Sequence, residues 1–187
     1  MLSNCFIGIG DANALKIVAT VGSEAITDYD IEMFAKLMCN VANKRDKNAK
    51  CKEEQIINEV VMMVVESKLK GFYIERMKID ISEDKEMQKH IESTMLEYGV
   101  EKSKVDHNDY EEIRKYVETD YVWNAILVSF INSQKITDGE IEAYRKKNPS
   151  IRTNEEAKQV IGIERATQKA SEIMTNLRKF YLVEFRI

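Results

Sequence analysis

The chain has few of the residues that interrupt regular structure, with one proline and seven glycines in 187 residues. Long helices fit this composition better than a loop-rich or all-β fold. The chain also has no excess of positive charge, since 28 basic residues stand against 32 acidic ones. That balance argues against nucleic acid as a partner, because nucleic-acid binders carry a basic surface. No run of about 18 apolar residues is present, so the sequence contains no complete transmembrane helix.

Residue types that carry catalysis or bind metals are equally sparse. The two histidines, His90 and His107, are isolated, and the three cysteines form no C-x-x-C pair. A metal site is therefore not expected. The glycines at residues 8–10 lack the strand and the helix that flank a phosphate-binding loop. We expect no cofactor, no catalytic residue and no enzymatic activity from this chain.

The first 14 residues, MLSNCFIGIGDANA, are typical of the second half of a secretory signal. An apolar stretch over residues 5–9 is followed by the small-x-small triplet of residues 12–14, a pattern that precedes a cleavage site. The alternative is a disordered N-terminal tail. We expect an exported protein whose folded domain comprises residues 15–187.

A small β-hairpin is predicted at the start of that domain. In Lys16–Val21, β-branched residues recur in the pattern of a strand. Residues 22–24 supply a turn, and residues 25–27 form the second strand. Thr27 then caps a first helix, with Asp30 at its third position.

Apolar positions at helical spacing predict five further helices. They run from Lys52 to about Arg76, from Ile81 to Gly99, from Asp106 or Asn108 to Ser133, from Thr137 to just before Pro149, and over residues 155–179. The final segment Tyr181–Ile187 alternates as a strand does, and its natural partner is the hairpin, because two strands alone are marginally stable. The sequence predicts a mainly α protein: a bundle of about six helices with a small antiparallel sheet formed by the N-terminal hairpin and the C-terminal strand.

Whether the cysteines form a disulfide depends on the compartment in which the protein resides. Cleavage after Ala14 removes Cys5 and leaves Cys39 and Cys51, which pair readily in an oxidising compartment. Cys39 lies at the end of the first predicted helix and Cys51 at the start of the second, so a bond between them would close the polar loop that joins the helices. Two free thiols in a reducing compartment are the alternative, and we favour the disulfide.

The ordered series of segments resembles a known family. This series includes two similar helix starts, I-T-D-x-D-I at residues 26–31 and I-T-D-G-E-I at residues 136–141. The stretches that carry the resemblance are Ile17–Phe34, Gln55–Met95, Tyr110–Asn148 and Glu172–Ile187. They resemble the N-terminal chaperone region of SurA-like periplasmic folding factors, which are related to trigger factor and PrsA. The resemblance implies a single SurA-like chaperone domain, completed by the closing helix and strand, in the periplasm of a Gram-negative cell.

One departure from that family concerns catalysis. Members usually carry parvulin-type prolyl isomerase domains between the I-T-D-x-E-I helix and the closing helix. Here only Pro149–Ile163 separates the two helices, which is too short for such a domain. The resemblance therefore implies the chaperone role without the isomerase role.

Three hypotheses of function follow. The first is an ATP-independent chaperone that captures extended segments of unfolded outer-membrane proteins in a groove between helices. The second is a relative of the peptidyl-prolyl isomerases whose catalytic domain has been lost. The third is a homo-oligomerising helical module, with a homodimer formed by exchange of the terminal helix and strand.

A peptide-binding surface needs accessible apolar side chains. Nine methionines are a high count for this length, and flexible thioethers suit surfaces that accept many partners. The fourth predicted helix carries its main apolar face on Tyr110, Ile113, Val117, Tyr121, Asn124, Val128 and Ile131. Trp123 and Phe130 lie off that face, so another helix or a client must cover them. The candidate client contacts are Met38, Met62, Met63, Phe72, Trp123 and Phe130, with core filling as the alternative for each.

Overall fold

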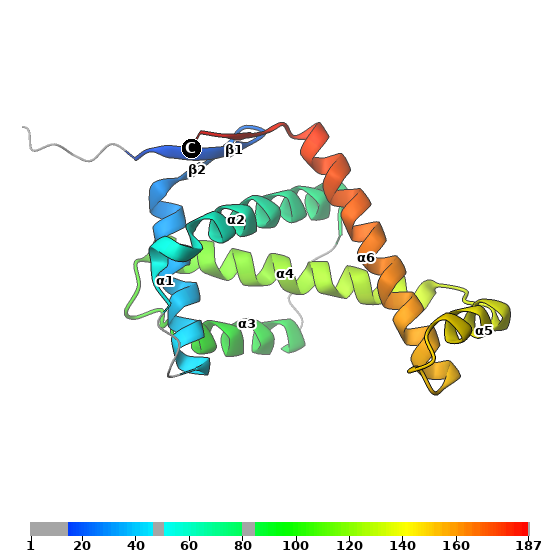
Figure 1. Cartoon of the computed structure of the whole chain (residues 1–187). Coiled ribbons are helices and arrows are strands. Elements are labelled where there is room, and N and C mark those ends of the chain that lie inside the picture. Colours follow the sequence, from blue (N-terminus) through cyan, green and yellow to red (C-terminus); the bar gives the residue numbers. More distant parts are fainter. Residues whose placement is uncertain (1–14, 47–50, 80–84, 187) are drawn as a thin grey trace, which may run out of the picture.

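The computed structural model describes residues 15–46, 51–79 and 85–186. Those ranges contain six helices and a three-stranded sheet, in which the N-terminal hairpin pairs with the C-terminal strand (Figure 1). The elements are β1 (Ile17–Val21), β2 (Glu24–Thr27), α1 (Asp28–Arg45), α2 (Glu53–Arg76), α3 (Lys85–Tyr98), α4 (His107–Ser133), α5 (Asp138–Lys147), α6 (Asn154–Phe180) and β3 (Val183–Phe185). The predicted fold class is confirmed. The signal remnant at residues 1–14, the opening of the third helix at residues 81–83 and residue 187 lie outside the described ranges.

The sheet joins the N-terminal hairpin to the C-terminal strand. Its order is β2-β1-β3 with antiparallel pairing throughout. On β1, Ala19 pairs with Phe185 and Val21 with Val183, and both β1 residues are fully buried. β3 is shorter than predicted, because Leu182 takes a left-handed φ of +40° where the chain turns out of α6.

The turn between β1 and β2 depends on a glycine. Gly22 has a φ of +60°, and its N–H donates a hydrogen bond of 2.5 Å to the carbonyl of Tyr181. A Cβ at this position would lie 3.4 Å from Cδ1 of the Tyr181 ring. The left-handed region is open to glycine and costly for other residues.

We expect Gly22→Ala to lower the free energy of unfolding by about 1–2 kcal/mol, because alanine is strained at this φ. Urea denaturation followed by circular dichroism measures the change. Gly139→Ala is the matched control, since Gly139 lies in α5 and a Cβ there meets no atom within 4 Å. Equal unfolding midpoints for the two variants would contradict the role given to Gly22.

The main core lies between the sheet and helices α1 to α4. Its largest fully buried side chains are Val21 and Ile26 of the sheet and Val65 and Leu69 of α2. α2 contacts α1, α4, α6 and β1, which explains why its apolar residues exceed a single stripe. This helix is therefore the centre of the bundle, as its sequence predicts.

A second, smaller hydrophobic cluster joins α5 to the first half of α6. It is built on Ile141, Ala157 and Ile161. Figure 1 shows α5 and this half of α6 reaching beyond the bundle, while the other half of α6 returns along it to the sheet. Where α6 crosses α4, a Cβ at Gly162 would come within 3.1 Å of Ile131, so the small residue allows the two helices to approach closely.

Two helix starts have the reciprocal hydrogen bonds that the repeated I-T-D pattern indicates. The Thr27 N–H donates to Asp30 Oδ2 at 2.8 Å, and the Thr137 N–H donates to Glu140 Oε2 at 2.8 Å. The Thr137 backbone and the Arg165 side chain lower the pKa of Glu140 to about 2. Glu140 thus holds the start of α5 and also binds α6 through Arg165.

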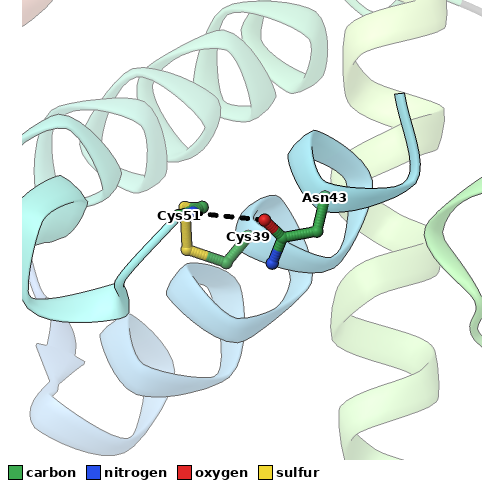
Figure 2. The surroundings of a disulfide bond; sticks show 3 residues. All are labelled: Cys39, Asn43 and Cys51. Carbon is green, nitrogen blue, oxygen red and sulfur yellow. Dashed lines mark hydrogen bonds between the residues drawn. A yellow bond between two sulfur atoms is a disulfide. The ribbon is translucent and has the colours of Figure 1, made fainter. Parts of the chain in front are cut away.

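A disulfide joins the second half of α1 to the segment before α2 (Figure 2), and α1 continues past Cys39 to Arg45, further than the sequence predicts. It links Cys39, which is buried, to Cys51 across a sequence separation of 12 residues, with the Cα atoms 5.2 Å apart. The Cys51 N–H also donates to Asn43 Oδ1 at 3.1 Å. This is the pairing that the sequence favours.

The buried face of α4 differs from the predicted stripe. Asn124 and Val128 belong to that stripe but are exposed, whereas Trp123 is buried. The short helix α3 contacts α4 through rings such as His90 and Tyr121, whose centroids are 4.9 Å apart. α3 is much shorter than α4, so the last turns of α4 pass beyond it (Figure 1) and their α3-facing side chains reach solvent.

Candidate functional site

The predicted client contacts lie on α1, α2 and α4 and differ in their exposure. Met38 of α1 and Met63 of α2 are half-buried against the main core. Met62 is 40% exposed, and Phe130 near the end of α4 is half-buried. Two of the three methionines among these candidates thus pack against the core, and Met62 is the accessible one.

Trp123 belongs to the core. Its side chain is 4% exposed, and its ring lies edge-on to Tyr73 of α2 with the centroids 5.6 Å apart. The second apolar face of α4 is thus covered by another helix at this point, which was one of the two outcomes that the sequence left open. We correct the assignment of Trp123 as an accessible client contact.

Phe72 is the predicted contact that lines a pocket. The pocket has a volume of about 170 Å³ and lies where β2, α1, α2 and α4 meet. Phe34, Val64 and Phe72 supply its large apolar surface. Its polar lining is Glu24, Asp30, Ser67, Lys68, Glu75, Glu112, Lys115, Tyr116 and Thr119.

A shallower depression of about 610 Å³ continues from this pocket between α2 and α4. The two hollows share Gly71, Glu75, Glu112, Lys115 and Thr119. The depression adds Ile74, Asn108, Glu111 and Glu118. We call the pocket and the depression together the α2–α4 groove.

Helical spacing and one small residue form this groove. On α2, Val64, Gly71 and Glu75 recur at intervals that place them on one side of the helix. A Cβ built at Gly71 meets no atom within 4 Å, so the missing side chain leaves open space here. Across the groove, Thr119 of α4 is 8% exposed and forms part of the floor.

One lysine in the groove is already neutralised. Lys68 Nζ lies 3.2 Å from Glu24 and 3.7 Å from Glu112. Burial lowers the pKa of Lys68, but the two carboxylates outweigh it and hold this pKa above its ordinary value. Lys68 therefore stays charged and ties β2, α2 and α4 together.

The remaining charged side chains of the groove are mainly acidic. Beyond the Lys68 cluster, Glu75, Glu111 and Glu118 line the groove with Lys115 as the other lysine. Glu111 lies 3.8 Å from Arg114. No ion pair within the described ranges involves Glu75 or Glu118, so their carboxylates remain available to a cationic group.

Tyr116 gives the groove a neutral hydroxyl. Its ring packs against Phe34 with centroids 5.2 Å apart. Burial, aided by nearby tyrosine and carboxylate groups, raises the pKa of the Tyr116 hydroxyl well above its ordinary value. The hydroxyl thus remains protonated and adds no negative charge.

A row of aromatic rings leads from the surface to the groove. Phe180 is 66% exposed and lies under Arg76, whose guanidinium carbon is 4.7 Å from the ring centroid. The Phe180 ring is 4.9 Å from Tyr181, and Tyr181 stacks on Phe72 at 4.4 Å. We call Phe180, Tyr181 and Phe72 the aromatic row.

Sequence reasoning missed most of this site. Phe34 is an ordinary core position of α1 by its spacing, and Gly71 stands alone within a helical pattern. The adjacent Phe180 and Tyr181 were the one visible signal, because two large aromatic residues in succession at a helix end cannot both face the core. The packing of β2, α1, α2 and α4 around the pocket leaves no pattern in the local sequence.

The comparisons with known proteins give no assignment. No model of a protein family matches this chain, and no curated protein matches it. Within the described ranges, no three His, Cys, Asp or Glu side chains are grouped so that they could hold a metal ion. None of the described helices is both long enough and apolar enough to cross a membrane.

Proposed function

We propose that the protein is an ATP-independent periplasmic chaperone that holds unfolded outer-membrane proteins by binding their extended segments. The observation that carries this proposal is the aromatic row, which leads from exposed Phe180 through Tyr181 to Phe72 at the groove. Exposed aromatic surface beside a pocket suits weak capture at several points, because aromatic rings bury a large apolar area with little loss of side-chain freedom.

Features of the fold and of its cysteines support the proposal. The hairpin, the helix bundle and the closing strand follow the order that the resemblance to SurA-like factors implies. β3 is an edge strand, and such an edge offers main-chain hydrogen bonds to an extended segment. The disulfide suits an oxidising compartment such as the periplasm.

Suppression of the aggregation of an unfolded β-barrel protein, measured by light scattering without ATP, tests the proposal. We expect Phe180→Ala to weaken suppression about fivefold, which corresponds to the loss of roughly 1 kcal/mol of apolar contact. Its melting temperature should hardly change, because the ring is largely exposed in the free protein. Leu96→Ala is the matched control, since Leu96 is 69% exposed and belongs to α3, across the bundle from the sheet (Figure 1).

Three outcomes separate the chaperone proposal from its alternatives. Failure of the wild-type chain to suppress aggregation would contradict the chaperone proposal. Catalysis of proline-limited refolding by the purified chain would instead support the isomerase alternative. A dimer that grows with concentration would support the helical module that exchanges its terminal elements.

A further inference from the structure

We infer that the α2–α4 groove selects basic segments of its clients, with an aromatic or large aliphatic side chain in the pocket and a neighbouring lysine or arginine on the acidic rim. The inference rests on the proposed function and names the class of segment that the groove accepts. It is carried by the size of the pocket and by the charge around it.

The pocket fits one large side chain. Its volume of about 170 Å³ is close to that of an engineered protein cavity of about 150 Å³ that binds benzene. Phe34, Val64 and Phe72 give it apolar walls, and the open space beside Gly71 leaves the approach unobstructed. An extended segment can thus place one ring or branched aliphatic side chain inside while its backbone lies along the depression.

The rim favours a positive neighbour for that side chain. Lys68 is held by Glu24 and Glu112, whereas Glu75 and Glu118 have no ion pair within the described part of the chain. Both line the depression beside the pocket. Glu118 is half-buried, and a partly shielded carboxylate attracts a cation more strongly than a fully solvated one does, because the effective dielectric constant is lower there.

Charge also argues against other occupants. An acidic segment would bring carboxylates against Glu75, Glu111 and Glu118, which outnumber the one lysine of the depression, Lys115. A second copy of this chain carries a net charge of −4, so self-association through an acidic groove is disfavoured. A segment with lysine or arginine beside an apolar side chain satisfies both the pocket and the rim.

Binding of short fluorescent peptides, followed by anisotropy, tests this selection. Three probes suffice: phenylalanine flanked by lysines, phenylalanine flanked by glutamates, and alanine flanked by lysines. We expect the first to bind most tightly, and added salt to weaken it, because salt screens exposed charges. Equal binding of the lysine and glutamate probes would overturn the inference.

Two groove variants locate the binding. Glu75→Gln with Glu118→Gln should weaken the lysine–phenylalanine probe about fivefold to tenfold, the loss expected for two partly exposed ion pairs. Glu59→Gln with Glu92→Gln is the matched control, because it changes the net charge equally at exposed positions outside the groove. Gly71→Leu should block the pocket, with Gly139→Leu as its control, since a Cβ at either glycine meets no atom within 4 Å.

The outcomes separate this inference from the proposed function. If the chain suppresses aggregation while the groove variants bind the probe as their controls do, the inference fails and the chaperone proposal stands. If the chain suppresses no aggregation, the proposed function fails. A dimer of the wild-type chain that Gly71→Leu dissociates would overturn the inference in favour of a second copy in the groove. Melting curves of all four variants verify that each is folded.

Discussion

Removal of Tyr181–Ile187 is expected to lower the melting temperature by about 6–12 °C or to abolish cooperative melting. The deletion removes the ring that stacks on Phe72 at 4.4 Å and the carbonyl that accepts the Gly22 N–H. It also removes β3 from the central strand β1 and leaves a two-stranded hairpin, which is marginal alone. Loss of the aromatic packing alone costs about 3 kcal/mol, which already corresponds to a fall of about 6–12 °C for a chain of this size.

A matched variant separates the strand from the ring. Tyr181→Ala removes the stack and keeps β3, so it should melt between the wild type and the deletion. Thermal melting by circular dichroism, with light scattering to detect aggregation through the newly exposed edge of β1, measures all three proteins. An unchanged melting curve after the deletion would refute the sheet shared by the two ends of the chain.

Local signals explain why the elements could be predicted. Thr27 and Thr137 each stand three residues before an acidic side chain, and the reciprocal bonds of a capping box need only those neighbours. The alternation of Tyr181, Val183 and Phe185 marks a strand wherever its partner lies. The partner then follows from stability, because a hairpin without a third strand is marginal.

Coverage by distant helices could not be predicted in the same way. Val128 has the spacing of a core residue, and it is exposed because α3, which begins at Lys85, does not extend along the last turns of α4. Trp123 lies off the predicted stripe and is buried because Tyr73 of α2 faces it. Helical periodicity tells which residues share a face, and tertiary packing decides which face is covered.

The groove is invisible to sequence reasoning for the same reason. Its pocket combines Glu24 of β2, Phe34 of α1, Gly71 of α2 and Tyr116 of α4. None of these residues lies near another in the sequence, and each has an ordinary local role. Phe72 could be selected as an apolar residue of α2, but its placement between the groove and Tyr181 depends on how α6 returns to the sheet.

Reduction of the Cys39–Cys51 disulfide is expected to lower the free energy of unfolding by about 2–3 kcal/mol. The bond closes a loop between residues 12 apart in the sequence, and in the chain-entropy model such a closure restricts the unfolded state by that amount. The melting temperature of the wild-type chain should therefore fall by about 4–12 °C when reductant is added. Native-state contacts of Cys51, such as its N–H to Asn43 Oδ1 at 3.1 Å, remain available without the bond.

The double variant Cys39→Ala, Cys51→Ala is the control for the reductant itself, because it should melt at one temperature with or without reductant. Thiol titration of denatured, non-reduced protein lacking residues 1–14 measures the bond directly, since Cys39 and Cys51 are then the two cysteines of the chain. We expect no reactive thiol on material from an oxidising compartment. Two reactive thiols on such material would contradict the disulfide and remove one support for the proposed periplasmic location, because the pairing depends on an oxidising environment as well as on geometry.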